Sequence, residues 1–181
     1  MDRKKYEFTG ETRALSSTTI LHRIRAVIDI PHAGVNAGDI GGWIESDSNL
    51  SHSGNALVGG NARVGGNARV DGNARVDGNA WVGGNARVDG NAWVGGNAWV
   101  GGNARINSNK DFIIIGPIGS RSDFTTFHKN ADGIVRVRCG CFSGTVDEFL
   151  AAVQKKHGGN RFGREYRIAA ELAKAHILEE D

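Results

Sequence analysis

The sequence predicts a mainly β protein: a left-handed parallel β-helix with an N-terminal β cap and a small C-terminal α+β domain. Two observations support this fold class. Between residues 55 and 107 an aliphatic residue recurs every six positions, with an alanine two positions before it. The flanking sequence has mixed composition and no such repeat. We therefore divide the chain into an N-terminal cap (1–54), a hexapeptide-repeat β-helix (55–107) and a C-terminal α+β domain (108–181).

The repeat reads Asn-Ala-x-Val and is followed by Gly-Gly or Asp-Gly. Its aliphatic positions are Val58, Val64, Val70, Val76, Val82, Val88, Val94, Val100 and Ile106. Because side chains alternate along a strand, the alanine and the aliphatic residue both point into the core. Glycine and asparagine tolerate the positive φ of a corner. A disordered tract has a similar composition, but aliphatic positions that stay in register argue against disorder.

In this pattern residues 55–107 resemble the hexapeptide-repeat family, whose members form left-handed β-helices. The strings LHRIRAVIDI and AGDIGGWIESDSNLSHSGNA also resemble the opening of hexapeptide-repeat proteins encoded by phages and prophages. The C-terminal segment is similar to a domain found behind various repeat bodies in phage-encoded proteins. These resemblances imply a fold and a phage origin, and they carry no established activity.

The residues between alanine and the aliphatic position point outward and form three columns. The columns are Arg63, Trp81 and Trp99; Leu57, Arg75 and Trp93; and Arg69, Arg87 and Arg105. Stacked exposed tryptophans are unfavourable in water unless a partner covers them. Hexapeptide-repeat proteins commonly form trimers, so the resemblance implies a homotrimer, or a multiple of it, with Trp81, Trp93 and Trp99 at the interface.

The arginine column Arg69, Arg87 and Arg105 has two interpretations. Asp71 and Asp89 follow two residues after arginines, so the column is either a solvated ladder of ion pairs or an anion site. Guanidinium groups bind phosphate in a bidentate manner, which is the basis of the second interpretation. Of the two we expect the ladder of ion pairs.

The two flanking segments show ordinary secondary-structure signals. Residues 21–30 alternate like a half-buried strand, with residues 5–10 as a partner. Residues 112–115 form an apolar strand that Gly116–Gly119 should end, and residues 134–141 alternate again. Thr145-x-x-Glu148 is a capping box that opens a helix, and a second helix follows Gly158-Gly159.

The string GPIGSRSDFTTFH is the C-terminal candidate for ligand binding. A glycine-rich turn followed by hydroxyl and basic side chains is able to hold phosphate. Its candidate residues are Gly119, Ser120, Arg121, Thr125, Thr126 and His128, with Arg136 and Arg138 from the next strand. It lacks the ending of a Walker A loop, and an ordinary polar turn remains the alternative.

Composition argues against several classes of function. The 22 basic and 20 acidic side chains nearly cancel, so we do not expect nucleic acid as a partner. No apolar run is long enough to span a membrane, and the start MDRKKYEF does not resemble a secretory signal. Cys139 and Cys141 lack the spacing of a metal site, and we expect no metal or cofactor. Two reduced cysteines fit a cytoplasmic location, in the host cell if a phage encodes the protein.

The remaining functions are an enzyme, a binding protein and a structural module. Hexapeptide-repeat acyltransferases resemble one another in placing a histidine base beside the coils. The histidines of this chain are His22, His32, His52, His128, His157 and His176, and none lies within residues 53–127. We therefore expect a non-catalytic binding protein that captures a small anionic, nucleotide-like ligand such as a host defence signal. An acyltransferase and a structural trimerisation module are the alternatives.

Overall fold

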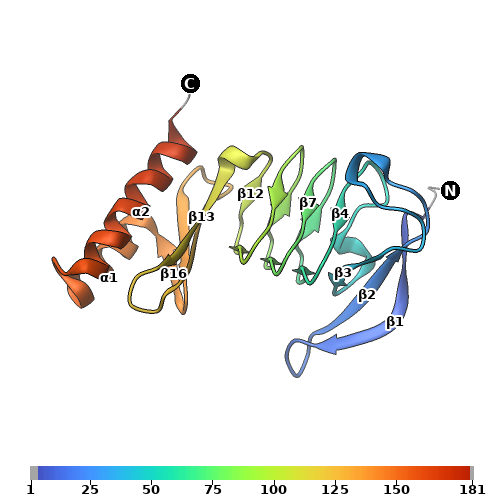
Figure 1. Cartoon of the computed structure of the whole chain (residues 1–181), viewed down its shortest axis with the longest axis horizontal. Helices are drawn as coiled ribbons and strands as arrows, with labels where there is room; N and C mark the ends of the chain where they lie inside the picture. Colours follow the sequence, from blue (N-terminus) through green and yellow to red (C-terminus); the bar gives the residue numbers. More distant parts are fainter. Residues whose placement is uncertain (1–3, 180–181) are drawn as a thin grey trace.

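The computed structural model describes residues 4–179. The chain forms an elongated body with a β hairpin at one end and two helices at the other (Figure 1). The N-terminal strands are β1 (Tyr6–Ala14), β2 (Ile20–Ala26) and β3 (Ile40–Ile44). The repeat forms β4 (Leu57–Val58), β5 (Arg63–Val64), β6 (Arg69–Val70), β7 (Arg75–Val76), β8 (Trp81–Val82), β9 (Arg87–Val88), β10 (Trp93–Val94), β11 (Trp99–Val100) and β12 (Arg105–Ile106).

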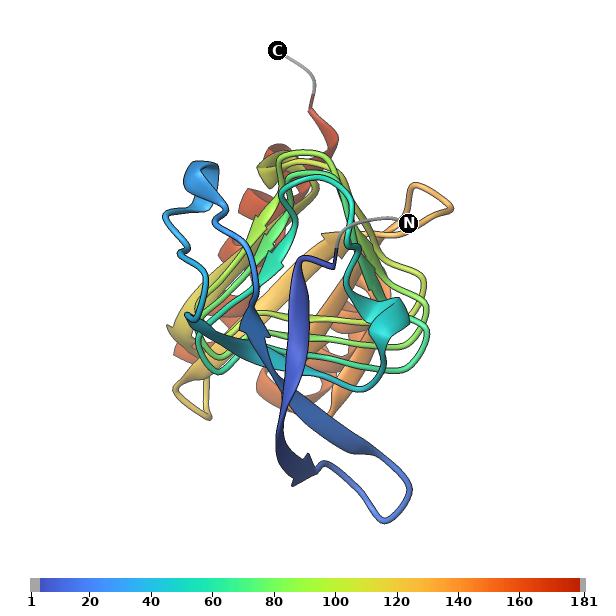
Figure 2. The same ribbon diagram turned by 90° about the vertical axis from the view of Figure 1, so that its right-hand side faces the viewer.

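These short strands build a parallel β-solenoid, which confirms the predicted parallel β-helix, and its left-handedness stays a prediction. Strands six residues apart lie on different sides of the coil, and every third strand pairs in parallel. The sheets run β4–β7–β10, β6–β9–β12 and β1–β2–β3–β5–β8–β11. Seen along its axis, the solenoid has a triangular outline beyond which the β1–β2 hairpin projects (Figure 2). The three outward columns are those that the repeat predicts.

The period of six places small and branched side chains inside the solenoid. The alanine and valine positions of the repeat are buried, as predicted. Corner asparagines stack from coil to coil through amide hydrogen bonds, for example from Asn67 Nδ2 to Asn85 Oδ1 at 3.1 Å. The corner glycines adopt positive φ, as Gly84 does at 64°. Asparagine and glycine therefore recur at the corners, where asparagine links successive coils and glycine allows the turn.

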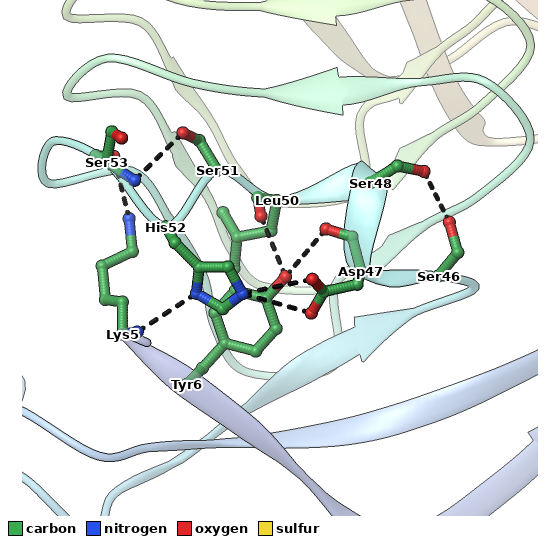
Figure 3. A network of polar contacts seen from close by, with 9 residues as sticks. All are labelled: Lys5, Tyr6, Ser46, Asp47, Ser48, Leu50, Ser51, His52 and Ser53. Atoms are coloured by element: carbon green, nitrogen blue, oxygen red, sulfur yellow. Dashed lines mark hydrogen bonds and ion pairs between the residues drawn. The ribbon is translucent and has the colours of Figure 1, made fainter. Parts of the chain in front are cut away.

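A polar network closes the N-terminal end of the solenoid (Figure 3). The Tyr6 hydroxyl donates to the carbonyls of Asp47 and Leu50, at 3.0 and 2.9 Å. Lys5 Nζ donates to the carbonyls of Ser53 and Gly54, at 3.4 and 3.5 Å. Burial lowers the pKa of Lys5 to about 8, while the negative charge of Asp71 opposes this shift. The side chains of Lys5 and Tyr6 thus donate hydrogen bonds to backbone carbonyls that lie just before the repeat.

The C-terminal part is a four-stranded antiparallel sheet covered by two helices. The strands are β13 (Phe112–Ile118), β14 (Asp123–Lys129), β15 (Val135–Cys139) and β16 (Phe142–Thr145), in that order. Helix α1 (Val146–His157) begins at the predicted capping box and ends at Gly158, and α2 is Arg161–Leu178. The prediction that Gly116–Gly119 ends the strand was wrong, because β13 continues to Ile118 with a shift in pairing register after Ile115. Among the described residues, no helix is long and apolar enough to cross a membrane.

The two faces of this sheet have different neighbours. Phe127, Val135 and Val137 pack with the buried faces of α1 and α2. The opposite face lies toward the last coil, so the sheet stands between the solenoid and the helices (Figure 1). The hydroxyl of Thr126 accepts a hydrogen bond from Trp99 N at 3.0 Å, and Ala131 N donates to Asn103 O at 3.0 Å. The sheet therefore caps the end of the solenoid.

Candidate functional site

A cavity of about 410 Å³ lies where the C-terminal sheet meets the last coil, and we call it the junction cavity. Trp99, Gly101, Gly102 and Asn103 line it from the coil, and His128, Asn130, Arg136, Arg138, Ser143 and Gly144 line it from the sheet. Its volume falls in the range of small-molecule sites.

Strand pairing brings the basic residues of the sheet together. His128 lies opposite Arg136 across β14 and β15, and Thr126 lies opposite Arg138. Residues paired in register point to the same face, so these side chains share one wall. The Arg138 guanidinium lies over the ring of Trp99, with its carbon 3.8 Å from the ring centroid. This stacking joins the sheet to the coil beside the cavity.

The junction cavity gathers buried polar atoms that have no partner. Among the described residues, six buried side-chain nitrogen or oxygen atoms make no hydrogen bond. Four of them belong to residues that line the cavity: His128 Nδ1, Asn130 Oδ1, Arg136 Nε and Arg138 Nε. Buried polar groups are nearly always hydrogen-bonded in folded proteins, to protein or to ordered water, so this cluster makes the junction cavity the candidate site of the chain.

The charges around the cavity favour an anion. Arg136 pairs with Asp132 at 3.3 Å, and Arg138 has no ion pair in the described part of the chain. Burial lowers the pKa of His128 to about 4, the backbone of Lys129 opposes this shift, and the charge of Arg136 lowers it further. His128 is therefore neutral near pH 7. Two guanidinium groups and a neutral imidazole carry more N–H donors than the cavity wall has acceptors for.

The structure separates the residues of the predicted C-terminal site into two groups. Thr126, His128, Arg136 and Arg138 lie on the solenoid side of the sheet, and all but Thr126 line the junction cavity. Ser120 and Arg121 instead line a smaller cavity of about 130 Å³ together with Cys139, Phe142 and Tyr166. Thr125 pairs with Cys139 and is buried on the helix side.

The backbone of the predicted phosphate-binding turn is already occupied. Gly119 N donates to Glu165 Oε2 at 2.7 Å, and this carboxylate also pairs with Arg161 at 2.7 Å. Gly119 has φ of 70° and lies against Tyr166, where a Cβ would come within 2.0 Å of the phenol. The glycine at this turn thus serves close packing against α2, which corrects the expectation that its N–H is free for phosphate.

The arginine column has the predicted geometry but different partners. Arg69, Arg87 and Arg105 pair in register across β6, β9 and β12. The carboxylates of Asp71 and Asp89 accept the N–H groups of Gly72 and Gly90, so the expected ladder of ion pairs is absent among the described residues. An arginine does pair with the aspartate two residues after it on the neighbouring column, where Arg75 lies 2.5 Å from Asp77.

The outward tryptophans are partly covered within the chain. Arg63 lies over Trp81 at 5.6 Å and Arg75 lies over Trp93 at 5.1 Å. Trp93 remains 55% exposed and Trp99 remains 43% exposed. Cation–π contacts thus cover one face of the Trp81 ring and one face of the Trp93 ring. Burial of Trp81, Trp93 and Trp99 in a trimer stays a prediction.

His52, the histidine beside the first coil, is poorly placed to act as a base. His52 Nδ1 accepts from Lys5 N at 3.1 Å, and its Nε2 donates to the Asp47 carboxylate at 3.2 Å (Figure 3). Both ring nitrogens are therefore engaged. His128, at the other end of the coils, is 5% exposed and lines the junction cavity.

Sequence reasoning missed Asn130, Ser143 and the coil residues Trp99 and Gly101–Asn103 as parts of one site. Period-two alternation on β14 was a signal for grouping Thr126 and His128 and for leaving Thr125 out. No such signal shows that the sheet docks on the last coil. The chain matches no protein-family model, and no curated protein is similar to it in sequence.

Proposed function

We propose that this protein binds a small anionic, nucleotide-like ligand in the junction cavity without catalysing a reaction. The observation that carries the proposal is the set of four buried, unpartnered polar atoms on residues around one cavity that two arginines line. A ligand that supplies acceptors to the two arginine Nε–H groups and a donor to Asn130 Oδ1 would remove the cost of leaving these groups unpaired.

The chemistry of the wall favours phosphate and an attached polar or planar group. Guanidinium groups form strong charge-assisted hydrogen bonds with phosphate oxygens. Asn130 and Ser143 offer neutral groups for the rest of the ligand, and Trp99 adds an aromatic surface. A nucleotide combines these features in one molecule.

The setting that we propose follows from the sequence resemblances. A phage-encoded oligomer in the host cytoplasm, most simply a homotrimer, would sequester a nucleotide signal used in host defence. Resemblance to phage hexapeptide-repeat proteins and the exposed Trp93 support this setting. The structural module and the acyltransferase are the competing functions, and the structural module gives the unpartnered groups around the cavity no role.

The test is calorimetric titration of the purified protein with inorganic phosphate, adenosine monophosphate and a panel of linear and cyclic nucleotides. We expect a binder whose affinity falls at least about tenfold in Arg136→Gln and Arg138→Gln, because each loses a charge-assisted hydrogen bond. Arg121→Gln and Arg87→Gln are matched controls outside the cavity and should bind like the wild type.

Three outcomes would contradict the proposal. Loss of binding in Arg121→Gln alone would place the site at the C-terminal turn, and loss in Arg87→Gln alone would place it on the arginine column. Absence of any binder would favour the structural module. Circular dichroism of each variant shows whether the fold is retained.

A further inference from the structure

The corners of the solenoid repeatedly bind carboxylate oxygens. Each corner is a Gly-Gly or Asp-Gly pair whose second glycine has positive φ. At four corners the N–H of that glycine donates to a carboxylate of the chain itself. These contacts are Gly66 N to Glu45 Oε2 at 2.6 Å, Gly72 N to Asp71 Oδ1 at 2.8 Å, Gly78 N to Asp77 Oδ1 at 2.5 Å and Gly90 N to Asp89 Oδ1 at 2.6 Å.

The chain thus shows what this corner geometry binds. A turn with one residue at positive φ directs neighbouring backbone N–H groups outward, and such concave sets of donors attract anions. At the corner of Gly65 and Gly66 the residue before the second glycine has no side chain, and Glu45 from the N-terminal cap supplies the oxygen instead. A carboxylate from elsewhere is therefore able to replace the local aspartate.

Among residues 4–179 no carboxylate contacts the corner of Gly101 and Gly102 in this way, and this corner lines the junction cavity. In the described part of the chain the N–H of Gly102 has no hydrogen-bond acceptor. A Cβ built on either glycine would meet no atom of the described residues within 4 Å, so the structure leaves the space beside this corner open.

The end of the solenoid leaves a second donor open at the same corner. In earlier coils the equivalent N–H groups of Gly65 and Gly83 donate to Val82 O and Val100 O, each at 3.0 Å. No further coil follows Gly101, and its N–H has no acceptor among residues 4–179. Two consecutive backbone donors therefore border the cavity that Arg136 and Arg138 line from the sheet.

We infer that the N–H groups of Gly101 and Gly102 form the second half of the anion site and that its ligand is a phosphate compound. This inference rests on the proposed function. Phosphate has three or four oxygens in a tetrahedral arrangement, so it is able to accept from the corner and from the guanidinium wall at once. A carboxylate has two oxygens in one plane and serves fewer of these donors.

The repeat itself provides the test variant. Gly101→Asp introduces the residue that stands at the equivalent position in Asp71, Asp77 and Asp89, so the coil should accept it. Its carboxylate should accept the N–H of Gly102 and repel the ligand. Gly95→Asp is the matched control, because it adds the same charge at the same repeat position and Gly95 does not line the cavity.

The probe is adenosine monophosphate, with inorganic phosphate, adenosine and succinate titrated alongside by calorimetry. We expect Gly101→Asp to weaken adenosine monophosphate binding at least about tenfold and Gly95→Asp to leave it within about twofold. Inorganic phosphate should compete with the nucleotide, and adenosine and succinate should not. In unaltered protein, the amide proton of Gly102 should shift on adding the nucleotide, which tests the inference even if Gly101→Asp does not fold.

The outcomes separate this inference from the function beneath it. If Gly101→Asp binds normally while Arg138→Gln does not, the corner is not part of the site and the proposed function stands. Equal binding of succinate and adenosine monophosphate would overturn the assignment to phosphate, as would equal binding of adenosine. If the wild type binds no member of the panel, both proposals fail.

Discussion

At the scale of single residues, one column of the solenoid consists of cationic and aromatic side chains stacked on one another. Arg23, Trp43, Arg63, Trp81 and Trp99 pair in register from β2 to β11. Arg138 continues this column from the sheet by stacking on Trp99. The column thus ends at the wall of the junction cavity, where the arginine also offers donors to a ligand.

The buried imidazole of His128 makes stability depend on pH. The unfolded chain protonates this residue below about pH 6.5, whereas burial holds its pKa in the folded protein at about 4. The unfolded state therefore binds more protons between these values, and the free energy of unfolding falls as the pH drops. Between about pH 7 and pH 4.5 we expect a loss of about 2 kcal/mol from this residue.

Urea unfolding of the wild type and His128→Gln at both pH values measures this contribution. The variant should lose about 2 kcal/mol less than the wild type over the same interval. The aspartates with lowered pKa, Asp71 and Asp77, lose their contribution at pH values below this window and are the same in both proteins. Equal losses in wild type and variant would show that His128 is not held neutral by the fold.

At the scale of elements, the corner glycines have two separate roles that substitutions distinguish. Gly84 and Gly102 both have positive φ, at 64° and 60°. A Cβ on Gly84 would lie 3.0 Å from the nitrogen and oxygen of Gly102 in the next coil, whereas a Cβ on Gly102 meets nothing. Gly102→Ala should therefore cost only the backbone strain, about 1 kcal/mol. Gly84→Ala should cost at least about twice as much, because the coils must also separate.

Thermal unfolding of the two alanine variants tests this difference. We expect the highest unfolding midpoint for the wild type, a lower one for Gly102→Ala and the lowest for Gly84→Ala. Equal midpoints for the two variants would mean that a clash between stacked corners does not lower the stability of the solenoid.

The solenoid was predictable because one short pattern fixes every coil. Alanine and valine at fixed spacing determine which side chains fill the core, and Gly or Asn at the corners fixes the turns. The turn at Gly119 was less predictable, because its glycine is explained by contact with Tyr166 on α2, far along the chain. Local composition suggested phosphate binding there, and only tertiary packing shows that Glu165 takes the N–H.

At the scale of the whole molecule, the candidate site lies where two hydrophobic cores meet. One core runs through the solenoid from Tyr6 to Phe112, and the other lies between the C-terminal sheet and its helices. The sequence predicted three of the cavity residues, His128, Arg136 and Arg138, because alternation and charge are local properties. The coil wall at Gly101–Asn103 was not predictable, since nothing in the repeat marks which coil the sheet covers.

The exposed tryptophans lead to a prediction about assembly. Trp93 is 55% exposed and is the most exposed tryptophan on the columns, so it is the sharpest test of the proposed homotrimer. We expect light scattering to report three times the mass of one chain and Trp93→Glu to shift the protein to monomers. Arg87→Glu adds a negative charge on the arginine column and should leave the trimer intact. A monomeric wild type, or an unchanged mass in Trp93→Glu, would contradict the assignment of Trp93 to an interface.

A crystal structure of the wild-type protein soaked in adenosine monophosphate tests the central claim most directly. Our account predicts density for the phosphate in the junction cavity, within hydrogen-bond distance of Arg136 or Arg138 and of the N–H groups of Gly101 and Gly102. An empty junction cavity at saturating nucleotide, or a phosphate bound at Gly119–Arg121 or on the column of Arg69, Arg87 and Arg105, would contradict it.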